Sequence, residues 1–170
     1  LVYPWMKSHH LGDINILVSF ALLPALGTFF VAVGAYDPQS LLMILPIGLI
    51  TVAILHANNT RDVKTDLQAG LGTITTSVSL MNAKAIYTFE IFAPYALALL
   101  YVILLGQPWT LLAVVLTLPL ALRNVRTMIQ AEDDLPYRGI QRLDQTTAQL
   151  QMAFGLLYAL GFFLGSWLGV

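Results

Sequence analysis

The sequence contains no cysteine and few charges. Without cysteine, the chain has neither a disulfide framework nor thiol chemistry. Charged residues make up 10% of its 170 residues, whereas soluble domains average about 25%. So few charges cannot cover a surface exposed to water, which indicates that a lipid bilayer is the solvent for most of the chain. The net charge of −1 gives no basis for binding nucleic acid.

Long apolar runs take the place of the missing charges. Five of them are long enough to cross a bilayer, which requires about 20 helical residues. They lie at approximately residues 14–33, 41–57, 85–105, 109–130 and 150–168. No repeat or low-complexity tract divides them. The sequence therefore predicts an all-α fold, a single polytopic membrane domain with about five transmembrane helices.

Basic residues distinguish the two sides of this predicted bundle. If the five runs cross the membrane alternately, all eight Lys and Arg residues fall on one side. They lie in the N-terminal segment with Lys7, in the 58–84 loop and in the 123–149 segment. The positive-inside rule makes that side cytoplasmic. We therefore expect an integral protein of the plasma or inner membrane whose charged loops face the cytoplasm.

The segment 56–70, HANNTRDVKTDLQAG, concentrates polar residues at the end of the second run. Asp62 and Asp66 lie four residues apart, which places both on one face of a helix. Two like charges so placed repel each other unless a cation lies between them. Mg²⁺ prefers oxygen ligands and commonly takes one or two carboxylates together with substrate phosphates. The spacing therefore predicts Asp62 and Asp66 as catalytic metal ligands, although DxxxD alone is equally typical of a charged connector.

Basic and amide side chains surround the two aspartates. Arg61 could neutralise a diphosphate through its planar fork, and Lys64 could do so as a point charge. Asn58 and Asn59 add neutral donors and acceptors on the membrane side. A diphosphate head at the membrane surface with an apolar tail in the bilayer is a polyprenyl diphosphate. Metal neutralisation of the departing diphosphate helps to break its bond to carbon.

The same residues resemble the second aspartate-rich motif of UbiA-type membrane prenyltransferases. The similarity is closest to the menaquinone branch, the 1,4-dihydroxy-2-naphthoate prenyltransferases. The shared pattern is HANNTRDxxxDxxAGxxT, which runs from His56 to Thr73. Further similar segments are Leu11-Gly12-Asp13, Leu45-Pro46-Ile47-Gly48, Thr147-Ala148-Gln149-Leu150 and Phe154-Gly155-Leu156-Leu157-Tyr158.

The resemblance implies a fold and an activity. The fold is a bundle of about nine membrane helices, of which this chain would be the C-terminal part, with two aspartate-rich motifs facing each other across a cavity. The activity is Mg²⁺-dependent transfer of a polyprenyl chain to an aromatic acceptor. In this branch the acceptor is 1,4-dihydroxy-2-naphthoate, whose carboxylate leaves as carbon dioxide. The resemblance also implies that Asp62 and Asp66 bind metal. The flanking residues would contact the diphosphate or support the carboxylates; they are Asn58, Asn59, Arg61 and Lys64.

The sequence departs from the family pattern at two points. The family's first aspartate-rich motif, of the form NDxxDxxxD, does not occur in these 170 residues. We therefore expect the chain alone to hold at most half of an active site and to be inactive. Leu67 stands where relatives often carry a basic residue, which would weaken one contact with the diphosphate.

Other interpretations of the chain remain open. The aspartates could bind the transported cation of a membrane carrier, or the chain could be a non-catalytic helix bundle. Within the same superfamily the acceptor could be hydroxybenzoate, haem, a chlorophyll precursor or a glycerol phosphate. Glu90 lies inside the third run, where an ionisable residue is a functional candidate, but a structural partner is the simpler interpretation. His56 could pair with an aspartate, and Arg123 and Arg126 could hold phosphate or extend to the headgroups.

Overall fold

The computed structural model describes residues 12–132 and 136–170. Lys7 and Leu11, which entered the predictions above, lie outside these residues. The described part of the chain forms helices and no strand. Five of its helical segments are long and apolar enough to cross a membrane, which confirms the predicted all-α membrane fold.

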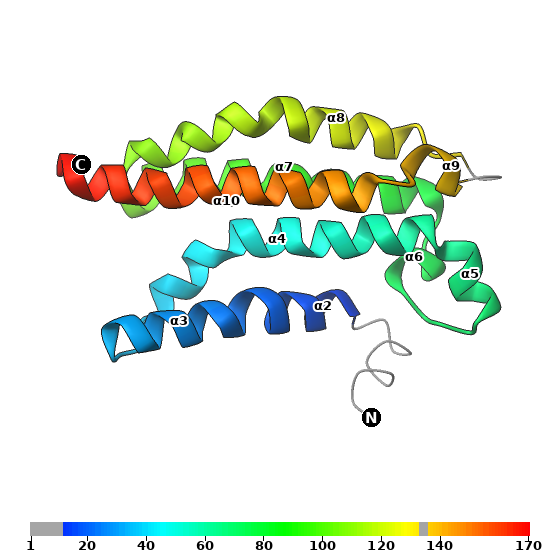
Figure 1. Ribbon diagram of the computed structural model, residues 1–170, viewed down its shortest axis with the longest axis horizontal. Coiled ribbons are helices and arrows are strands. Elements are labelled where there is room, and N and C mark those ends of the chain that lie inside the picture. Colours follow the sequence, from blue (N-terminus) through cyan, green and yellow to red (C-terminus); the bar gives the residue numbers. More distant parts are fainter. Residues whose placement is uncertain (1–11, 133–135) are drawn as a thin grey trace.

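The five long segments lie side by side along one axis (Figure 1). They are α2 (Gly12–Ile16) continued by η1 (Leu17–Leu22) and α3 (Leu23–Val33); α4 (Pro38–Arg61); α7 (Leu80–Leu105); η2 (Trp109–Thr117) continued by α8 (Leu118–Ile129); and α10 (Leu143–Leu168). Three short helices connect them: α5 (Val63–Gln68), α6 (Ile74–Ser77) and α9 (Pro136–Ile140). All three short helices gather at the same end of the bundle, to the right in Figure 1.

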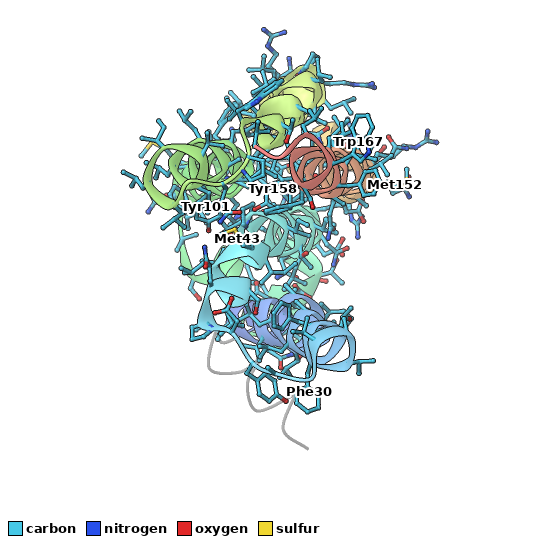
Figure 2. The ribbon with its side chains drawn as sticks, turned by 90° about the vertical axis from the view of Figure 1, so that its left-hand side faces the viewer. Phe30, Met43, Tyr101, Met152, Tyr158 and Trp167 are labelled. Atoms are coloured by element: carbon cyan, nitrogen blue, oxygen red, sulfur yellow. The ribbon has the colours of Figure 1, made fainter. Side chains whose placement is uncertain are left out.

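Helix α4 is the centre of the bundle. It packs against α7 and α10 on one side and against η1 on the other. The end-on view in Figure 2 shows α4 between the α2–α3 segment and the group formed by α7, α8 and α10. The α2–α3 segment is peripheral, because only 6% of its apolar span is buried, against 39% for α4. The side of α4 that faces α7 and α10 is therefore more heavily covered than the side that faces the α2–α3 segment.

Local sequence signals explain where α4 begins. Asp37 caps the helix by accepting a hydrogen bond of 3.1 Å from the backbone N–H of Gln39. Pro38 follows at the first helical position, where its missing N–H would have no helical partner anyway. At its other end α4 continues past the apolar run to Arg61. The polar motif therefore begins inside the helix.

Glycines allow α10 to approach η2 closely. A Cβ at Gly161 would lie 2.9 Å from the Cα of Leu111, and one at Gly165 would overlap the ring of Pro108. The close approach lets the hydroxyl of Thr110 donate a hydrogen bond of 2.5 Å to the carbonyl oxygen of Gly161. This small-xxx-small spacing is a common device for packing membrane helices.

Buried hydroxyl and amide groups join further pairs of helices. The hydroxyls of Tyr87 and Thr147 are 2.6 Å apart and link α7 to α10. The amide of Gln151 donates a hydrogen bond of 2.8 Å to the hydroxyl of Thr51 and links α10 to α4. Because apolar contact alone does not favour protein over lipid, such bonds help to fix which helices are neighbours.

Candidate functional site

The polar motif lies at the end of α4 and continues through α5. Asp62 interrupts the helix, with φ −95° and ψ 7°, so α4 ends at Arg61 and α5 begins at Val63. The backbone N–H of Asp66 nevertheless donates to the carbonyl oxygen of Asp62 at 2.9 Å. Asp62 and Asp66 therefore remain one helical turn apart, as their spacing predicted, although the helix is not continuous between them.

The guanidinium of Arg61 holds the outer aspartate of the motif. Its Nε atom donates a hydrogen bond to one carboxylate oxygen of Asp62 and its Nη2 atom donates to the other, each at 2.9 Å. Nη2 also donates to the side-chain oxygen of Asn58. Nη1 donates a bond of 2.7 Å to a carboxylate oxygen of Asp144, in the first turn of α10. The sequence left two roles open for Arg61, and its contacts in this structure are those of a residue that supports carboxylates.

Asp66 occupies a more enclosed position than Asp62. Its residue is 9% exposed, whereas the Asp62 side chain is 41% exposed. The chain turns sharply after α5, where the N–H of Leu71 donates to the Asp66 carbonyl at 2.8 Å. Gly70 makes this turn with φ +67°, a conformation that glycine adopts without strain. The two aspartates thus differ in their access to solvent.

The remaining predicted site residues lie in two other places. Asn59 is buried within α4. Lys64 is on α5 and, with Leu67, lines a small pocket of about 260 Å³. The structure therefore joins Asn58, Arg61 and Asp62 through hydrogen bonds, and it places Lys64 at the small pocket. The polar residues that share this pocket with Lys64 are Thr60, Thr75 and Thr76.

A buried pair involves the first residue of the motif. The Nδ1 atom of His56 is 3.5 Å from a carboxylate oxygen of Glu90 on α7, and both residues are at least 95% buried. Among the described residues, neither ring nitrogen of His56 makes a hydrogen bond. The sequence suggested an aspartate as the partner of His56, whereas the carboxylate that it approaches is that of Glu90. The pair therefore links α4 to α7, the long helices before and after the segment that contains Asp66.

An apolar groove leads away from the motif along α4. Near the motif, a cavity of about 290 Å³ lies between η1, α4 and α10, and Asn58, Asp144, Thr51 and Phe20 line it. Phe20 also lines a larger cavity of about 790 Å³ between η1, α3, α4 and α10. We call the two together the α4 groove. Met43, near the far end, is about 22 Å from Asn58, since 15 helical residues rise roughly 1.5 Å each.

The donor set of the site fits a magnesium ion bound together with a phosphorylated ligand. Asp62 and Asp66 offer carboxylate oxygens, which Mg²⁺ prefers. Over residues 12–132 and 136–170, no three His, Cys, Asp or Glu side chains gather as a complete metal site. Mg²⁺ usually retains waters and takes one or two carboxylates plus substrate phosphates, so two aspartates are sufficient as the contribution of this chain.

Asp144 is the site residue that sequence reasoning missed. It lies 83 positions from Arg61 in the chain, so no spacing rule connects the two. Its position in the first turn of a long helix is its one local signal. Because the helix dipole favours an acidic residue there, that position does not by itself indicate a functional role.

Comparison with known proteins identifies the family. Residues 1–138 match the model of the UbiA prenyltransferase family. UbiA prenyltransferase domain-containing protein 1 of Gallus gallus is 34% identical over 158 residues, which cover 91% of this chain and 44% of that protein. The Xenopus tropicalis protein of the same name is 35% identical over 158 residues, which cover 91% of this chain and 42% of that protein. The Homo sapiens protein is 32% identical over 155 residues, with 91% and 43% covered.

The chain therefore spans less than half the length of these curated relatives. The family match covers the motif and four of the five long helical segments. Together with the all-helical membrane fold, it establishes that the chain belongs to the UbiA prenyltransferase family.

Proposed function

We propose that this chain supplies part of the active site of a membrane prenyltransferase that uses Mg²⁺, a polyprenyl diphosphate and an aromatic acceptor. One observation carries the proposal: Asn58 and Asp144, which both bind the guanidinium that holds Asp62, line the end of an apolar groove that extends along α4. A polar site joined to a long apolar groove suits a substrate with a diphosphate head and a hydrocarbon tail. The family resemblance implies another aspartate-rich motif, the family's first, which does not occur in these 170 residues, so the proposal concerns the full-length protein.

In this proposal the motif residues bind the diphosphate head of the substrate and the groove binds its polyprenyl tail. Asp62 and Asp66 would hold the metal, and Arg61 keeps the Asp62 carboxylate in place through its fork. Asn58 and Asn59 lie on the membrane side, and Lys64 adds positive charge on α5. Bound Mg²⁺ would supply charge neutralisation of the departing diphosphate. The α4 groove would hold the polyprenyl tail away from water.

Transfer then requires the bond between the allylic carbon and the diphosphate oxygen to break. As the diphosphate leaves with both electrons of that bond, the allylic carbon becomes cationic and the electron-rich ring of the acceptor attacks it. We infer from the resemblance to the menaquinone branch that the acceptor is 1,4-dihydroxy-2-naphthoate, whose carboxylate leaves as carbon dioxide. The distribution of basic residues supports a site on the cytoplasmic side of a plasma or inner membrane.

The direct test replaces Asp66 with Asn in the full-length protein. Membranes containing the variant would be supplied with Mg²⁺, farnesyl diphosphate and either 1,4-dihydroxy-2-naphthoate or 4-hydroxybenzoate, and the products would be measured by mass spectrometry. We expect prenylated naphthoquinol from the parent protein and a loss of product from Asp66→Asn, with unchanged membrane insertion. Glu132→Gln is the matched control, because Glu132 is an exposed acidic residue outside the motif.

The outcomes separate the alternatives. Near-normal turnover by Asp66→Asn would contradict the metal role of the motif. Product with 4-hydroxybenzoate alone would retain the enzyme class and change the acceptor. Cation flux through vesicles without any prenylated product would favour a carrier.

A further inference from the structure

Asp144 lies beside the metal motif although it belongs to a different part of the chain. It is in the first turn of α10, and its Oδ2 atom is 2.7 Å from Nη1 of Arg61. Its side chain is 22% exposed, and the Arg61 side chain is 24% exposed. Because both groups are largely removed from water, their charge-assisted bond is screened less than a surface ion pair.

The planar guanidinium of Arg61 transmits this contact to Asp62. One edge, Nε and Nη2, binds both oxygens of Asp62, while Nη1 binds Asp144. The fork is rigid, so fixing Nη1 also fixes the plane in which Nε and Nη2 lie. That plane determines how the Asp62 carboxylate is oriented. Asn58 accepts a further bond from Nη2 and holds the same group from α4.

Asp144 does not complete the metal site itself. In the described part of the chain no third acidic side chain joins two others in an arrangement that could hold an ion. Asp144 therefore acts on the site through Arg61. An ionised carboxylate has about four lone-pair positions, so Asp62 retains acceptor capacity after it has accepted the two bonds of the fork.

We propose that Asp144 is a positioning residue: through Arg61 it orients the Asp62 carboxylate for a divalent ion bound with diphosphate. This inference rests on the proposed function of Asp62 as a metal ligand. It makes α10, the last long helix of the chain, part of the support of a motif at the end of α4. Replacement of a group that orients a metal ligand from behind typically lowers metal affinity by about 10- to 100-fold.

A purely structural role for Asp144 is the competing explanation. An acidic residue in the first turn of a helix stabilises that helix through its dipole, and the Asp144 carboxylate also accepts a hydrogen bond of 2.9 Å from the N–H of Gln145. Loss of that role would lower the stability of the protein. It would leave the metal affinity of the folded molecules unchanged, so the two explanations differ in a measurable quantity.

The test measures binding of Mn²⁺ with inorganic pyrophosphate to the purified full-length protein. Free and bound Mn²⁺ are distinguished by electron paramagnetic resonance, so the readout does not depend on turnover. We expect Asp144→Asn to raise the dissociation constant for Mn²⁺ by about tenfold or more, in the range typical of groups behind a metal ligand. Glu132→Gln, which removes the same charge from an exposed position, should leave the constant unchanged. The melting temperature of each variant gives its stability separately.

A second variant tests the route through the guanidinium. Arg61→Lys removes the fork and raises the dissociation constant, and in that background Asp144→Asn should have no further effect, because nothing remains to transmit it. Asp144→Glu should restore much of the affinity lost in Asp144→Asn, since it keeps the charge.

The results separate failure of this inference from failure of the proposed function. If Asp62→Asn abolishes Mn²⁺ binding and Asp144→Asn changes it by less than about twofold, well below the effect expected of a positioning group, Asp144 is only structural. Equal effects of Asp144→Asn with and without Arg61 would also overturn the inference. If the parent protein binds no Mn²⁺ in the presence of pyrophosphate, or if Asp62→Asn binds it normally, the proposed metal site and this inference fail together.

Discussion

The hydroxyl of Tyr101 on α7 donates a hydrogen bond of 2.6 Å to the backbone carbonyl oxygen of Leu42 on α4. In a regular helix this carbonyl would accept from the N–H four residues later, but that residue is Pro46, which has no N–H. Tyr158 on α10 donates in the same way to Met43, at 3.0 Å. Figure 2 shows Tyr101, Tyr158 and Met43 gathered at the centre of the bundle. Two neighbouring helices thus satisfy the backbone that the proline disturbs.

We expect Tyr101→Phe to lower the stability of the protein by about 1 kcal/mol, because it removes the hydrogen bond that the Leu42 carbonyl accepts from α7. Tyr36→Phe is the matched control, since the Tyr36 side chain is exposed. Thermal unfolding in detergent measures both variants. In a Pro46→Ala background, the new alanine supplies the missing N–H, so the effect of Tyr101→Phe should shrink. An equal loss in both backgrounds would show that the hydroxyl does not compensate for the proline.

Gly161→Ala should destabilise the contact between α10 and η2. The new methyl group would lie 2.9 Å from both the Cα of Leu111 and the carbonyl oxygen of Thr110, and backbone atoms cannot move aside as a flexible side chain can. We expect a loss of about 1–3 kcal/mol, as for other overpacked sites. Gly155→Ala on the same helix is the control, because its methyl group would meet only Ile47 at an ordinary 3.9 Å. Equal melting temperatures for the two variants would contradict this account.

The helices and the motif could be predicted from the sequence because both depend on local patterns. An apolar run of about 20 residues predicts a membrane helix by itself, and all five helical segments were found. The turn between Asp62 and Asp66 follows from their spacing in the same way. The break at Asp62 had no such signal, because the residues on either side of it are acceptable in a continuous helix.

The partners of the motif could not be predicted because they come from distant helices. Arg61 and Asp144 are 83 residues apart, and His56 meets a carboxylate from α7. Sequence reasoning found Arg61, His56 and Glu90 as individual candidates but could not pair them. The pairing depends on the order of helices around α4, and in lipid that order is set by packing and buried polar bonds more than by apolar patterning.

The buried pair of His56 and Glu90 should behave as a coupled unit. Each single substitution, His56→Leu or Glu90→Leu, leaves a polar group in an apolar setting, so both should destabilise the protein. The double variant should lose less than the sum of the two, by about 0.5–3 kcal/mol, as expected for side chains in direct contact. Thermal unfolding in detergent of the parent, the two single variants and the double variant gives the four values of this double-mutant cycle. Strictly additive losses would mean that His56 and Glu90, although 3.5 Å apart, do not stabilise each other.

Removal of divalent cations should abolish prenyl transfer by the full-length protein. In the proposed site this chain would contribute two aspartates together with phosphate oxygens and water, an arrangement that suits Mg²⁺. Mn²⁺ also suits carboxylate and water ligands and should restore turnover after treatment with EDTA. Ca²⁺ needs 6–8 oxygen ligands at longer distances, so it should restore much less. Full turnover in EDTA would contradict the metal role of Asp62 and Asp66.

If the proposed activity is correct, the α4 groove should limit the length of the polyprenyl chain that the full-length protein accepts. Ala159 on α10 lines the larger cavity near its far end, beside Met43 and Tyr158. Ala159→Phe would place a ring in the part of the cavity proposed for the distal end of a long tail, so turnover of long donors should fall while that of geranyl diphosphate is retained. Leu160→Phe is the matched control: Leu160 is the next residue on the same helix, is exposed and does not line the cavity. Competition between geranyl and longer polyprenyl diphosphates measures the preference. An equal reduction for all donors would indicate that the ring disturbs the helix and that the tail lies elsewhere.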